Sequence, residues 1–458
     1  MFATVPNDAE ETGKGASLEK LVIWLTGDSL RLDSNSALEH GIDLAMQNRA
    51  SLIPLAIAET HKWDGTQFGL PRSGMNWKRV RANSWFQLRK SLNSKGSGLW
   101  IGKGSVTERL QQLMQQFNIV AVVADLALSV EEERTFNELR SLGLEVHEVS
   151  VNELFEAEQL PFLASRPPKT FTQFRRQVEK KKAPIPLPPT SAPPVFPDFI
   201  NCPWPEPQSI IQASNVSVSP LVEVECIGGE QWAYDLWMNY LDRQALSHYK
   251  KTRNAFSGQF NSSHLSVALA HGLISPRRIW YDTLSYEQSI TKNESTYWLR
   301  FELLWREFLH WYARSSGVSL FARSGPEGKR FEFVDDENSF SQWQYGETGF
   351  PIVDACQKEL LASGWMSNRG RQLVASCLVN ELNLDWRLGA AWFESQLADF
   401  DVAINWGNWA YIAGVGPDPR GGRHFHLEQQ TQRYDSLGEH RKRWQQIPIM
   451  EHLPSLNK

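Results

Sequence analysis

The chain has 458 residues, of which 41% are hydrophobic and 22% charged, and its formal net charge is −5. These values are typical of a globular protein with two or three domains, and they argue against nonspecific coating of nucleic acid, although not against a local basic face. No apolar run is long enough to cross a bilayer, and the polar N-terminus has no apolar segment of a secretory signal. We therefore expect a cytoplasmic protein that does not enter membranes.

The four cysteines are scattered, and none has the CxxC spacing of a zinc site. We expect free thiols and no metal site. Tryptophan is unusually frequent, with 19 copies. Most of these indoles must be buried, and the rest are available for stacking or electron transfer.

Residues 18–155 are predicted to form an α/β domain. The candidate strands are residues 21–27, 51–58, 98–104, 118–127 and 144–151. Helical patterns separate the last three strands, at residues 108–117 and 131–143. This alternation predicts a Rossmann-like, mostly parallel sheet with right-handed crossovers. The turn after the first strand, TGDSLRLDSN, lacks GxGxxG, which argues against a nicotinamide dinucleotide site.

Residues 156–227 are predicted to be a linker, and residues 228–458 an all-α domain. Within the linker, residues 175–199 contain a proline density that excludes helix and sheet ladders, so we expect an extended connector. Its basic run Arg175–Lys182 fits either a nucleic-acid contact or a solvated helix end, and we favour the second. From residue 228 onward, apolar positions follow the helical period almost throughout.

Two segments of the helical half carry groups suited to anions or buried charges. Ser262, Ser263 and Ser266 begin a predicted helix, where hydroxyl and free N–H groups can hold a phosphate, although an ordinary N-cap also explains them. Glu302 and Arg306 are four residues apart. They form either an exposed ion pair or partly buried charges with specific partners.

Two further segments add cations, acids and amides. Asn368, Arg369 and Arg371 begin another predicted helix, and DFDVAINWGNW at residues 399–409 holds two Asp, two Asn and two Trp. The four segments together indicate a site within a helical bundle for a large ligand that carries phosphates and a ring system with a polar edge.

At these motifs the chain resembles the photolyase/cryptochrome flavoproteins, and among them the DASH-type cryptochromes. The resemblance covers nearly the whole chain. Its strongest motifs are YKKTRN, STYWLRFELLWRE, GETGFPIVDA, GWMSNRGRQ, DWRLGAAWFES and NWAYIAGVGPDPR, and looser ones are FGLPRSG and LPFLASRPPKTFTQFRRQVE. It implies an N-terminal antenna domain, a Pro-rich linker and a C-terminal helical domain that binds FAD in a folded shape.

The resemblance also implies which residues bind FAD. They are Tyr249, Ser262, Ser263, His264, Leu265, Ser266, Glu302, Arg306, Asn368, Arg371, Asp399, Asp401 and Asn405. Tyr249 and the Ser262–Ser266 stretch are implied to hold the phosphates, and Arg371 and Asp399 to pair beside the isoalloxazine. Asp401 is implied to bond the polar edge of the ring. Asn405 is implied to face the flavin N5, which is photolyase-like and suits reduced flavin.

The implied reaction is light-driven repair of cyclobutane pyrimidine dimers. Reduced FAD gives an electron to a dimer that has left the base stack, the ring splits, and the electron returns. The implied dimer-pocket residues are Glu302, Trp305, Asn368, Gln372 and Tyr411, and Arg369 is a candidate DNA phosphate contact. A (6-4) photolyase would have histidines at positions 368 and 372, so we reject that subclass.

Gln372 and Tyr411 stand where duplex-repair photolyases carry Met and Trp. Their weaker apolar contact with a flipped dimer offsets less of the unstacking cost, so single-stranded DNA is the expected substrate. The alternative function is a blue-light photoreceptor with weak or no repair. The chain ends at Lys458 without the long extension of many receptors, which favours repair. We expect a monomer.

Three departures from the family pattern have consequences. Trp409 and Trp386 match the first two members of the family's tryptophan relay, but Phe333 stands at the third and is far harder to oxidise. We expect inefficient flavin photoreduction unless Trp343 or Tyr345 substitutes. The antenna motif also differs, which weakens the expectation of 5,10-methenyltetrahydrofolate. Glu131 is the nearest match to its binding acids. His264, where Lys or Arg is common, weakens a phosphate contact.

A flavin oxidoreductase or a structural DNA-binding protein is a third interpretation. The missing nicotinamide motif argues against the first, and the acidic net charge argues against the second.

Overall fold

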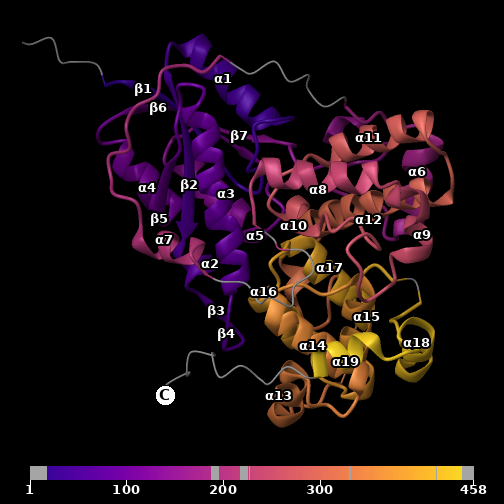
Figure 1. Cartoon of the computed structure of the whole chain (residues 1–458). Helices are drawn as coiled ribbons and strands as arrows, with labels where there is room; N and C mark the ends of the chain where they lie inside the picture. The colour runs from indigo at the N-terminus through magenta and orange to yellow at the C-terminus, as the bar shows by residue number, and fades with distance from the viewer. Residues whose placement is uncertain are drawn as a thin grey trace, which may run out of the picture.

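The structure, a computed structural model, describes residues 18–186, 195–216, 225, 227–329, 332–418 and 420–445. The polar N-terminal tail, the proline run at 187–194 and the C-terminal residues 446–458 lie outside the described residues. In Figure 1 an α/β unit forms from the first third of the chain, and helices make up the rest.

Five parallel strands form the sheet of the α/β unit, as predicted. They are β1 (Lys20–Leu25), β2 (Ser51–Glu59), β5 (Trp100–Gly104), β6 (Asn118–Asp125) and β7 (Val146–Val149), in the order β5-β2-β1-β6-β7. The order changes direction at β1. In such sheets a crevice forms at the carboxyl ends of the strands where the order reverses.

Helices cover both faces of this sheet because alternate residues of its strands point to opposite sides. Val22 and Trp24 pack with α1 (Ser36–Asn48) and α3 (Met75–Asn93). Leu21 and Ile23 pack with α4 (Val106–Leu113) and α5 (Val130–Ser141) on the other face. Both α4 and α5 were predicted from their apolar period. A short helix, α2 (Thr60–Trp63), and a two-residue hairpin, β3 (Thr66–Gln67) and β4 (Leu70–Pro71), extend from the unit toward the helical half.

The linker contains two helices, α6 (Phe171–Lys180) and α7 (Gln208–Ser214). The prediction of extended chain from residue 175 is therefore wrong for residues 175–180, and the interpretation of the basic run Arg175–Lys182 as a solvated helix end is confirmed. Phe171 and Phe174 are buried, and their rings contact Phe301 and Phe308. These buried rings lie on one side of α6, and their burial favours a helix in the residues just before the prolines.

The second half is all-α, as predicted. Its larger helices are α8 (Glu230–Asp242), α11 (Pro276–Ser289), α12 (Glu294–Ser316), α13 (Glu337–Tyr345), α14 (Pro351–Ser363), α15 (Asn368–Ser376), α16 (Trp386–Gln396), α17 (Val402–Ala413), α18 (Leu427–Tyr434) and α19 (Glu439–Gln445). Two shorter helices, α9 (Tyr249–Thr252) and α10 (Ser266–Ala270), contact α12. No strand is assigned among the described residues from 228 onward.

The two halves are joined by charged contacts to the segment that follows β7. Arg306 of α12 donates to the carbonyl oxygen of Asn152 at 2.6 Å, and Arg277 of α11 donates to that of Glu153 at 2.9 Å. The Glu307 carboxylate accepts the backbone N–H groups of Leu154 and Phe155. These bonds satisfy backbone groups that burial between the two halves would otherwise leave unpaired.

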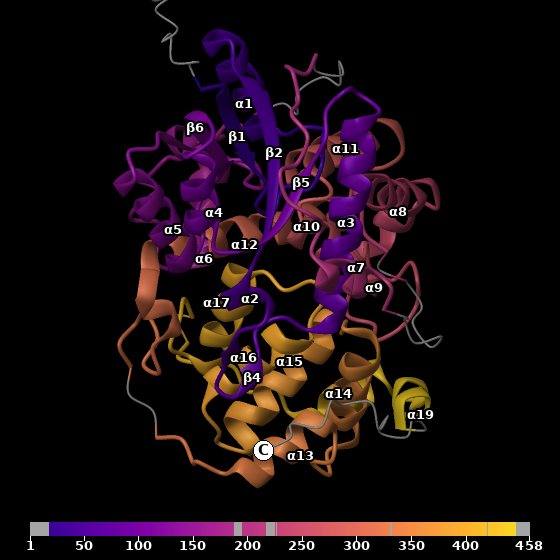
Figure 2. The ribbon, with the colours of Figure 1, turned by 90° about the vertical axis from the view of Figure 1, so that its left-hand side faces the viewer.

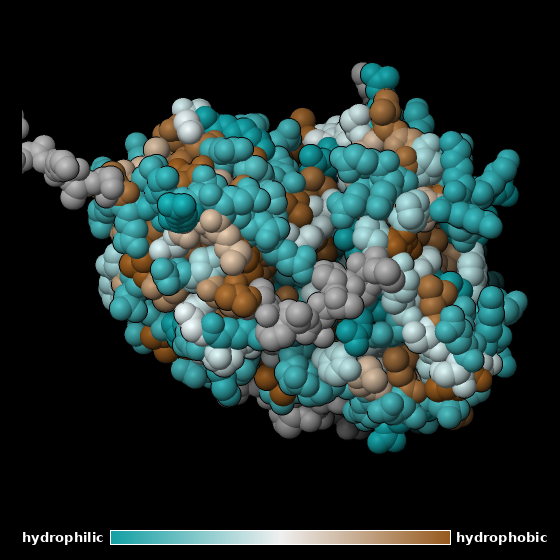
Figure 3. Space-filling model, turned by 90° about the horizontal axis from the view of Figure 1, so that it is seen from above, coloured by the Kyte–Doolittle hydropathy of each residue, from teal (hydrophilic) through white to brown (hydrophobic). Residues whose placement is uncertain are grey.

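The face of the molecule in Figure 3 is mostly hydrophilic, with apolar residues scattered over it. None of the described helices is both long and apolar enough to span a membrane. The described residues include no group of three or more His, Cys, Asp or Glu placed to hold a metal ion. Cys202, Cys356 and Cys377 are free thiols, and Cys226 lies outside the described residues.

Candidate functional site

A cavity in the helical half brings together five of the predicted cofactor residues from separate parts of the chain. These residues are Tyr249, Ser262, His264, Glu302 and Asn368. They come from α9, the loop before α10, α12 and the start of α15. Arg253 and Trp365 also line the cavity. It thus combines hydroxyl, amide and cationic groups with aromatic walls, which suits a ligand with phosphates and a flat ring.

The serine-rich loop reaches this cavity, but it does not cap a helix with its serines. Helix α10 begins at Ser266, and its N-cap is Leu265, whose side chain makes no capping bond. The ordinary N-cap explanation of the serines is therefore wrong. His264 has a left-handed φ of 51°, and its ring lies 4.9 Å from that of Trp365. Ser263 is buried, and Ser266 is exposed.

Glu302 points into the cavity with partners other than Arg306. Its carboxylate bonds Arg253 at 2.6 Å and accepts the Trp298 indole N–H at 3.0 Å. Arg306 instead donates to backbone carbonyl oxygens of Asn152 and Leu269. The exposed i,i+4 ion pair is therefore wrong, and the buried alternative is confirmed. Burial raises the pKa of Glu302 despite the opposing charge of Arg253.

Arg371 and Asp399 form the pair that the resemblance implied. The Arg371 guanidinium bonds Asp399 Oδ2 at 2.7 Å and the carbonyl oxygen of Met366 at 2.9 Å. Asp399 Oδ1 is buried and has no hydrogen-bond partner among the described residues. A buried acceptor without a donor is costly, so a ligand N–H at this position would stabilise the site. The free oxygen fits a flavin ring, which carries such a donor.

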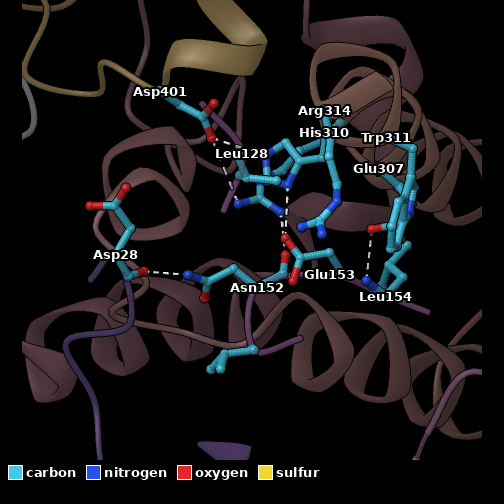
Figure 4. Close-up of polar contacts among 12 residues, drawn as sticks. Asp28, Leu128, Asn152, Glu153, Leu154, Glu307, His310, Trp311, Arg314 and Asp401 are labelled. Carbon is cyan, nitrogen blue, oxygen red and sulfur yellow. Dashed lines mark hydrogen bonds and ion pairs between the residues drawn. The ribbon is translucent and has the colours of Figure 1, made fainter. Parts of the chain in front are cut away.

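Asp401 begins α17 and belongs to a buried charged chain (Figure 4). Asp401 Oδ1 accepts the Ile404 N–H at 3.0 Å, which caps the helix, and Oδ2 is 3.0 Å from His310 Nε2. His310 Nδ1 lies 3.2 Å from Glu153 Oε1, and the His310 side chain is 1% exposed. Asp401 lines a cleft between the two halves, and it is not among the lining residues of the first cavity.

The two carboxylates determine the charge of this chain. Burial and Arg306 disfavour a proton on His310, but Asp401 and Glu153 outweigh them and raise its pKa. Burial would raise the pKa of Asp401 as well, but His310 and Arg306 hold it well below its usual range. The two carboxylates thus favour the imidazolium form of His310.

Asn405 lies on the first turn of α17. Its amide donates to the carbonyl oxygen of Ala390 at 2.9 Å, which ties α17 to α16. Asn405 is 7% exposed. The bond fixes the rotamer of the side chain before any ligand is present.

Trp305 and Tyr411 form an aromatic wall, with ring centroids 5.2 Å apart and planes at 76°. The Trp305 indole donates to Asn408 at 3.2 Å, and the Tyr411 hydroxyl accepts from Arg423. Gln372 lies on α15, and its Oε1 is buried without a hydrogen-bond partner among the described residues. These contacts hold both rings in place, and an unpaired amide oxygen suits a polar substrate.

Arg369, the candidate DNA contact, is occupied by neighbours. Its guanidinium bonds Asn254 at 3.1 Å and Gln430 at 3.3 Å, and it lies over the Tyr434 ring at 4.7 Å. A phosphate contact therefore requires rearrangement of these bonds.

The relay positions lie in the core around α16 and α17. Trp386 and Trp409 are 0% and 2% exposed, and Phe333 is half-buried beneath the Arg323 guanidinium at 5.2 Å. Trp343 contacts Trp409, with ring centroids 6.1 Å apart, whereas Tyr345 lies against Trp392.

A second cavity lies where the sheet order reverses, between the α/β unit and the helices. Trp63, Trp77 and Trp85 form part of its wall, and Glu131 and Asp125 also line it. Glu131 pairs with Arg72 at 2.5 Å and with His61 at 3.5 Å. Burial would raise the pKa of Glu131, but hydrogen bonds from His61 and Arg72 and the charge of Arg72 outweigh it and lower the pKa to about 2. Asp125 Oδ2 is buried without a hydrogen-bond partner among the described residues, and burial raises the pKa of Asp125 to about 7.

Comparison with known proteins agrees with this geometry. The family models described as DNA photolyase and as FAD binding domain of DNA photolyase match residues 21–194 and 298–457. A protein named Cryptochrome DASH from Idiomarina loihiensis is 37% identical over 433 residues, which are 93% of this chain and 92% of the relative. The chain belongs to the photolyase/cryptochrome family, as a DASH-type cryptochrome.

Other comparisons with this DASH-type chain agree. Cryptochrome DASH from Gloeobacter violaceus is 36% identical, covering 96% of this chain and 87% of the relative. The crystal structure of a Synechocystis cryptochrome superposes with a TM-score of 0.85 at 32% identity, covering 94% of this chain and 89% of that one. A bacterial class III photolyase from Agrobacterium tumefaciens gives 0.77 at 27% identity, covering 95% and 88%. The protein is a light-responsive flavoprotein with FAD as its cofactor.

Sequence reasoning missed several residues of this DASH-type site. Arg253 stood inside a quoted motif, YKKTRN, but nothing in its spacing pointed to Glu302. Glu153 and His310 are 157 residues apart, and no local pattern could pair them. Trp406 was visible within DFDVAINWGNW, and its contact with Trp386 appears only in the fold.

Proposed function

We propose that this flavoprotein repairs cyclobutane pyrimidine dimers in single-stranded DNA by electron transfer from reduced FAD. The observation that carries the proposal is the shared cavity, in which Glu302 and Asn368, at dimer-pocket positions, lie beside Tyr249, Ser262 and His264, at cofactor positions. A dimer bound by Glu302 and Asn368 would therefore lie next to a cofactor held by Tyr249, Ser262 and His264.

The residues of the chain bind and orient both partners. FAD, when bound and reduced, supplies the light-excited electron. Tyr249 and the serine loop would hold its phosphates, and the Arg371–Asp399 pair and Asn405 would orient its ring. Burial raises the pKa of Glu302 against the charge of Arg253, which favours a protonated carboxyl group that would hydrogen-bond a dimer carbonyl as negative charge develops on the dimer.

The preference for single strands follows from the Trp305–Tyr411 wall and Gln372. Two edge-to-face rings offer a stacking surface for a base that is already unpaired. Gln372 adds a polar group where a flipped dimer gains most from apolar contact, so less of the cost of opening a duplex is offset.

The test is light-dependent thymine recovery from a dimer-bearing oligothymidylate mixed with the chemically reduced holoprotein. Glu302→Gln should lower the rate of recovery while FAD absorbance is retained, because an amide N–H is a weaker hydrogen-bond donor to the dimer carbonyl than a carboxylic acid. Glu294→Gln, on the exposed start of the same helix, is the matched control and should repair normally. Recovery absent from the wild type with intact FAD spectra would favour the photoreceptor alternative.

We also propose that an antenna folate of the 5,10-methenyltetrahydrofolate type binds the cleft at the carboxyl ends of the strands. The unpaired Asp125 oxygen suits a pterin N–H group, and the three indoles give a flat apolar wall. Adding the folate to the holoprotein should sensitise FAD excitation. Asp125→Asn should weaken binding, and Asp43→Asn on α1, which does not line the cleft, should leave it unchanged. Equal affinity of the wild type, Asp125→Asn and Asp43→Asn for the folate would contradict this placement.

A further inference from the structure

In the tryptophan relay that photoreduces the flavin, Phe333 stands at the outer position in place of a tryptophan. The fold nevertheless places another indole, that of Trp406, beside Trp386. The Trp406 ring lies 5.8 Å from that of Trp386, centroid to centroid, at 77°. Trp406 and Trp409 are three residues apart on α17 and therefore share one side of that helix. Gly389, one turn after Trp386, abuts the Trp409 ring and leaves no room for a Cβ. The three indoles thus form one cluster between α16 and α17.

The hydrogen-bond partner of the Trp406 indole differs from those of Trp386 and Trp343. Trp406 Nε1 donates to Glu394 Oε2 at 3.1 Å, whereas the indoles of Trp386 and Trp343 donate to backbone carbonyl oxygens. A one-electron-oxidised indole is a far stronger acid than a neutral indole. A carboxylate can accept its proton, and a backbone carbonyl cannot hold one. Of Trp406, Trp386 and Trp343, Trp406 is therefore the one whose oxidised indole can pass its proton to a carboxylate.

Glu394 is prepared for this role by its surroundings. Its side chain is 2% exposed, and its other oxygen bonds Arg72 at 2.9 Å. Arg72 favours the charged form of the carboxylate, and a negative charge in contact with Trp406 favours its oxidation. Burial nevertheless raises the pKa of Glu394, which makes it a better proton acceptor than a solvated glutamate.

We propose that Trp406 is the terminal electron donor of the relay and that Glu394 takes its indole proton, which replaces the exit lost at Phe333. An electron leaves Trp409 toward light-excited oxidised flavin, Trp386 refills Trp409, and Trp406 refills Trp386. The N–H bond of Trp406 then breaks, and its proton forms an O–H bond on Glu394. One electron and one proton have left Trp406, and a neutral indolyl radical remains there.

This inference rests on the proposed cofactor site and predicts a spectroscopic signal on the polypeptide. Flash excitation of the wild-type holoprotein with oxidised FAD should produce a long-lived neutral indolyl radical whose formation slows in deuterated water. Trp406→Phe should abolish that radical. Trp311→Phe is the matched control, because Trp311 is equally buried, at 1% exposed, and also donates to a buried carboxylate, that of Glu307.

Two further variants keep the test decisive if Trp406→Phe folds poorly. Glu394→Gln retains an acceptor for the indole but cannot take its proton, so the radical should remain a cation, decay faster and lose the isotope effect. Glu307→Gln, which alters the other indole–carboxylate pair, should leave the signal unchanged. Adding Phe333→Trp to Trp406→Phe should restore a long-lived radical by reopening the outer position.

The result that overturns the proposal is an undiminished neutral radical in Trp406→Phe, or an isotope effect that persists in Glu394→Gln. A peptide map after prolonged illumination in air gives an independent measurement, with oxygen adducts expected on the Trp406 peptide. Repair is measured separately with chemically reduced FAD, which bypasses the relay. Loss of repair there would count against the proposed function, and loss of the radical against Trp406.

Discussion

Arg371 compensates for the burial of the Asp399 carboxylate inside the helical half through an ion pair at 2.7 Å. The Asp399 side chain is 1% exposed, and its second oxygen has no partner among the described residues, so the ion pair is its main compensation for burial. Removal of one member of such a pair leaves a buried charge that water cannot reach.

We expect Arg371→Ala to lower the free energy of unfolding of the FAD-free protein by about 3 kcal/mol, measured by chemical denaturation. Arg175→Ala, which breaks the surface pair with Glu179, is the control and should cost less than about 1 kcal/mol. Adding Asp399→Asn to Arg371→Ala should recover part of the loss, because the uncompensated charge is gone. An unfolding free energy equal to that of the wild type in Arg371→Ala would contradict this account.

At the scale of elements, α17 connects the helix start at Asp401 with the side chains at Asn405, Trp406 and Trp409. The helix ends at Gly414, whose φ of 75° is left-handed, so both of its ends are fixed. A shift of its first turn would therefore move the amide and the two indoles together.

We expect Asp401→Ala to be less stable than Asp401→Asn by about 1 kcal/mol, because asparagine can still cap the helix. Thermal unfolding of both variants measures the difference. Asp336 caps α13 near the surface without a histidine partner, so Asp336→Ala and Asp336→Asn calibrate the capping contribution. Equal stability of the two Asp401 variants would show that the cap contributes nothing.

The elements differ in how far the sequence predicted them. The five strands were found because parallel strands buried on both faces are nearly continuous apolar runs. Residues 175–180 were assigned to the connector because the prolines that follow dominated that interpretation, although Phe171, Phe174 and Val178 recur at helical spacing. The Arg371–Asp399 pair was implied by motif. Pairings such as Glu302 with Arg253 depend on tertiary packing and have no local pattern.

At the scale of the molecule, the Glu153–His310–Asp401 chain joins the α/β half to the FAD-binding half. Glu153 follows β7, His310 lies on α12, and Asp401 begins α17. Arg306 and Glu307 are the other charged groups that face this chain from α12. Its protonation state therefore influences how firmly the halves are held together.

We expect a specific pH dependence of stability from this chain. Because the pKa of His310 is raised, its contribution is complete below its unfolded value of about 6.5 and is lost as pH rises through the folded value. Asp401, with a lowered pKa, contributes above about 3.9 and loses its contribution as pH falls through the folded value. The stabilisation should be greatest between about pH 4 and 6.5.

Thermal unfolding of His310→Gln from pH 6 to 9 should lack the decline in stability that the wild type shows as pH rises, since glutamine does not titrate. His61→Gln is the control, because His61 is 46% exposed and pairs at the surface. Parallel melting curves for His310→Gln and the wild type from pH 6 to 9 would contradict this role.

The hydrogen bonds from α11 and α12 to the segment after β7 predict how the protein behaves when it is expressed as two fragments. Residues 152–155 form hydrogen bonds with side chains of α11 and α12. An N-terminal fragment that ends near residue 155 would therefore expose the Glu153 carboxylate and two backbone N–H groups that have lost their partners. The complementary piece would present unpaired arginines and His310. Two such fragments, produced from separate genes, should be insoluble alone and recover a native-like complex when co-expressed.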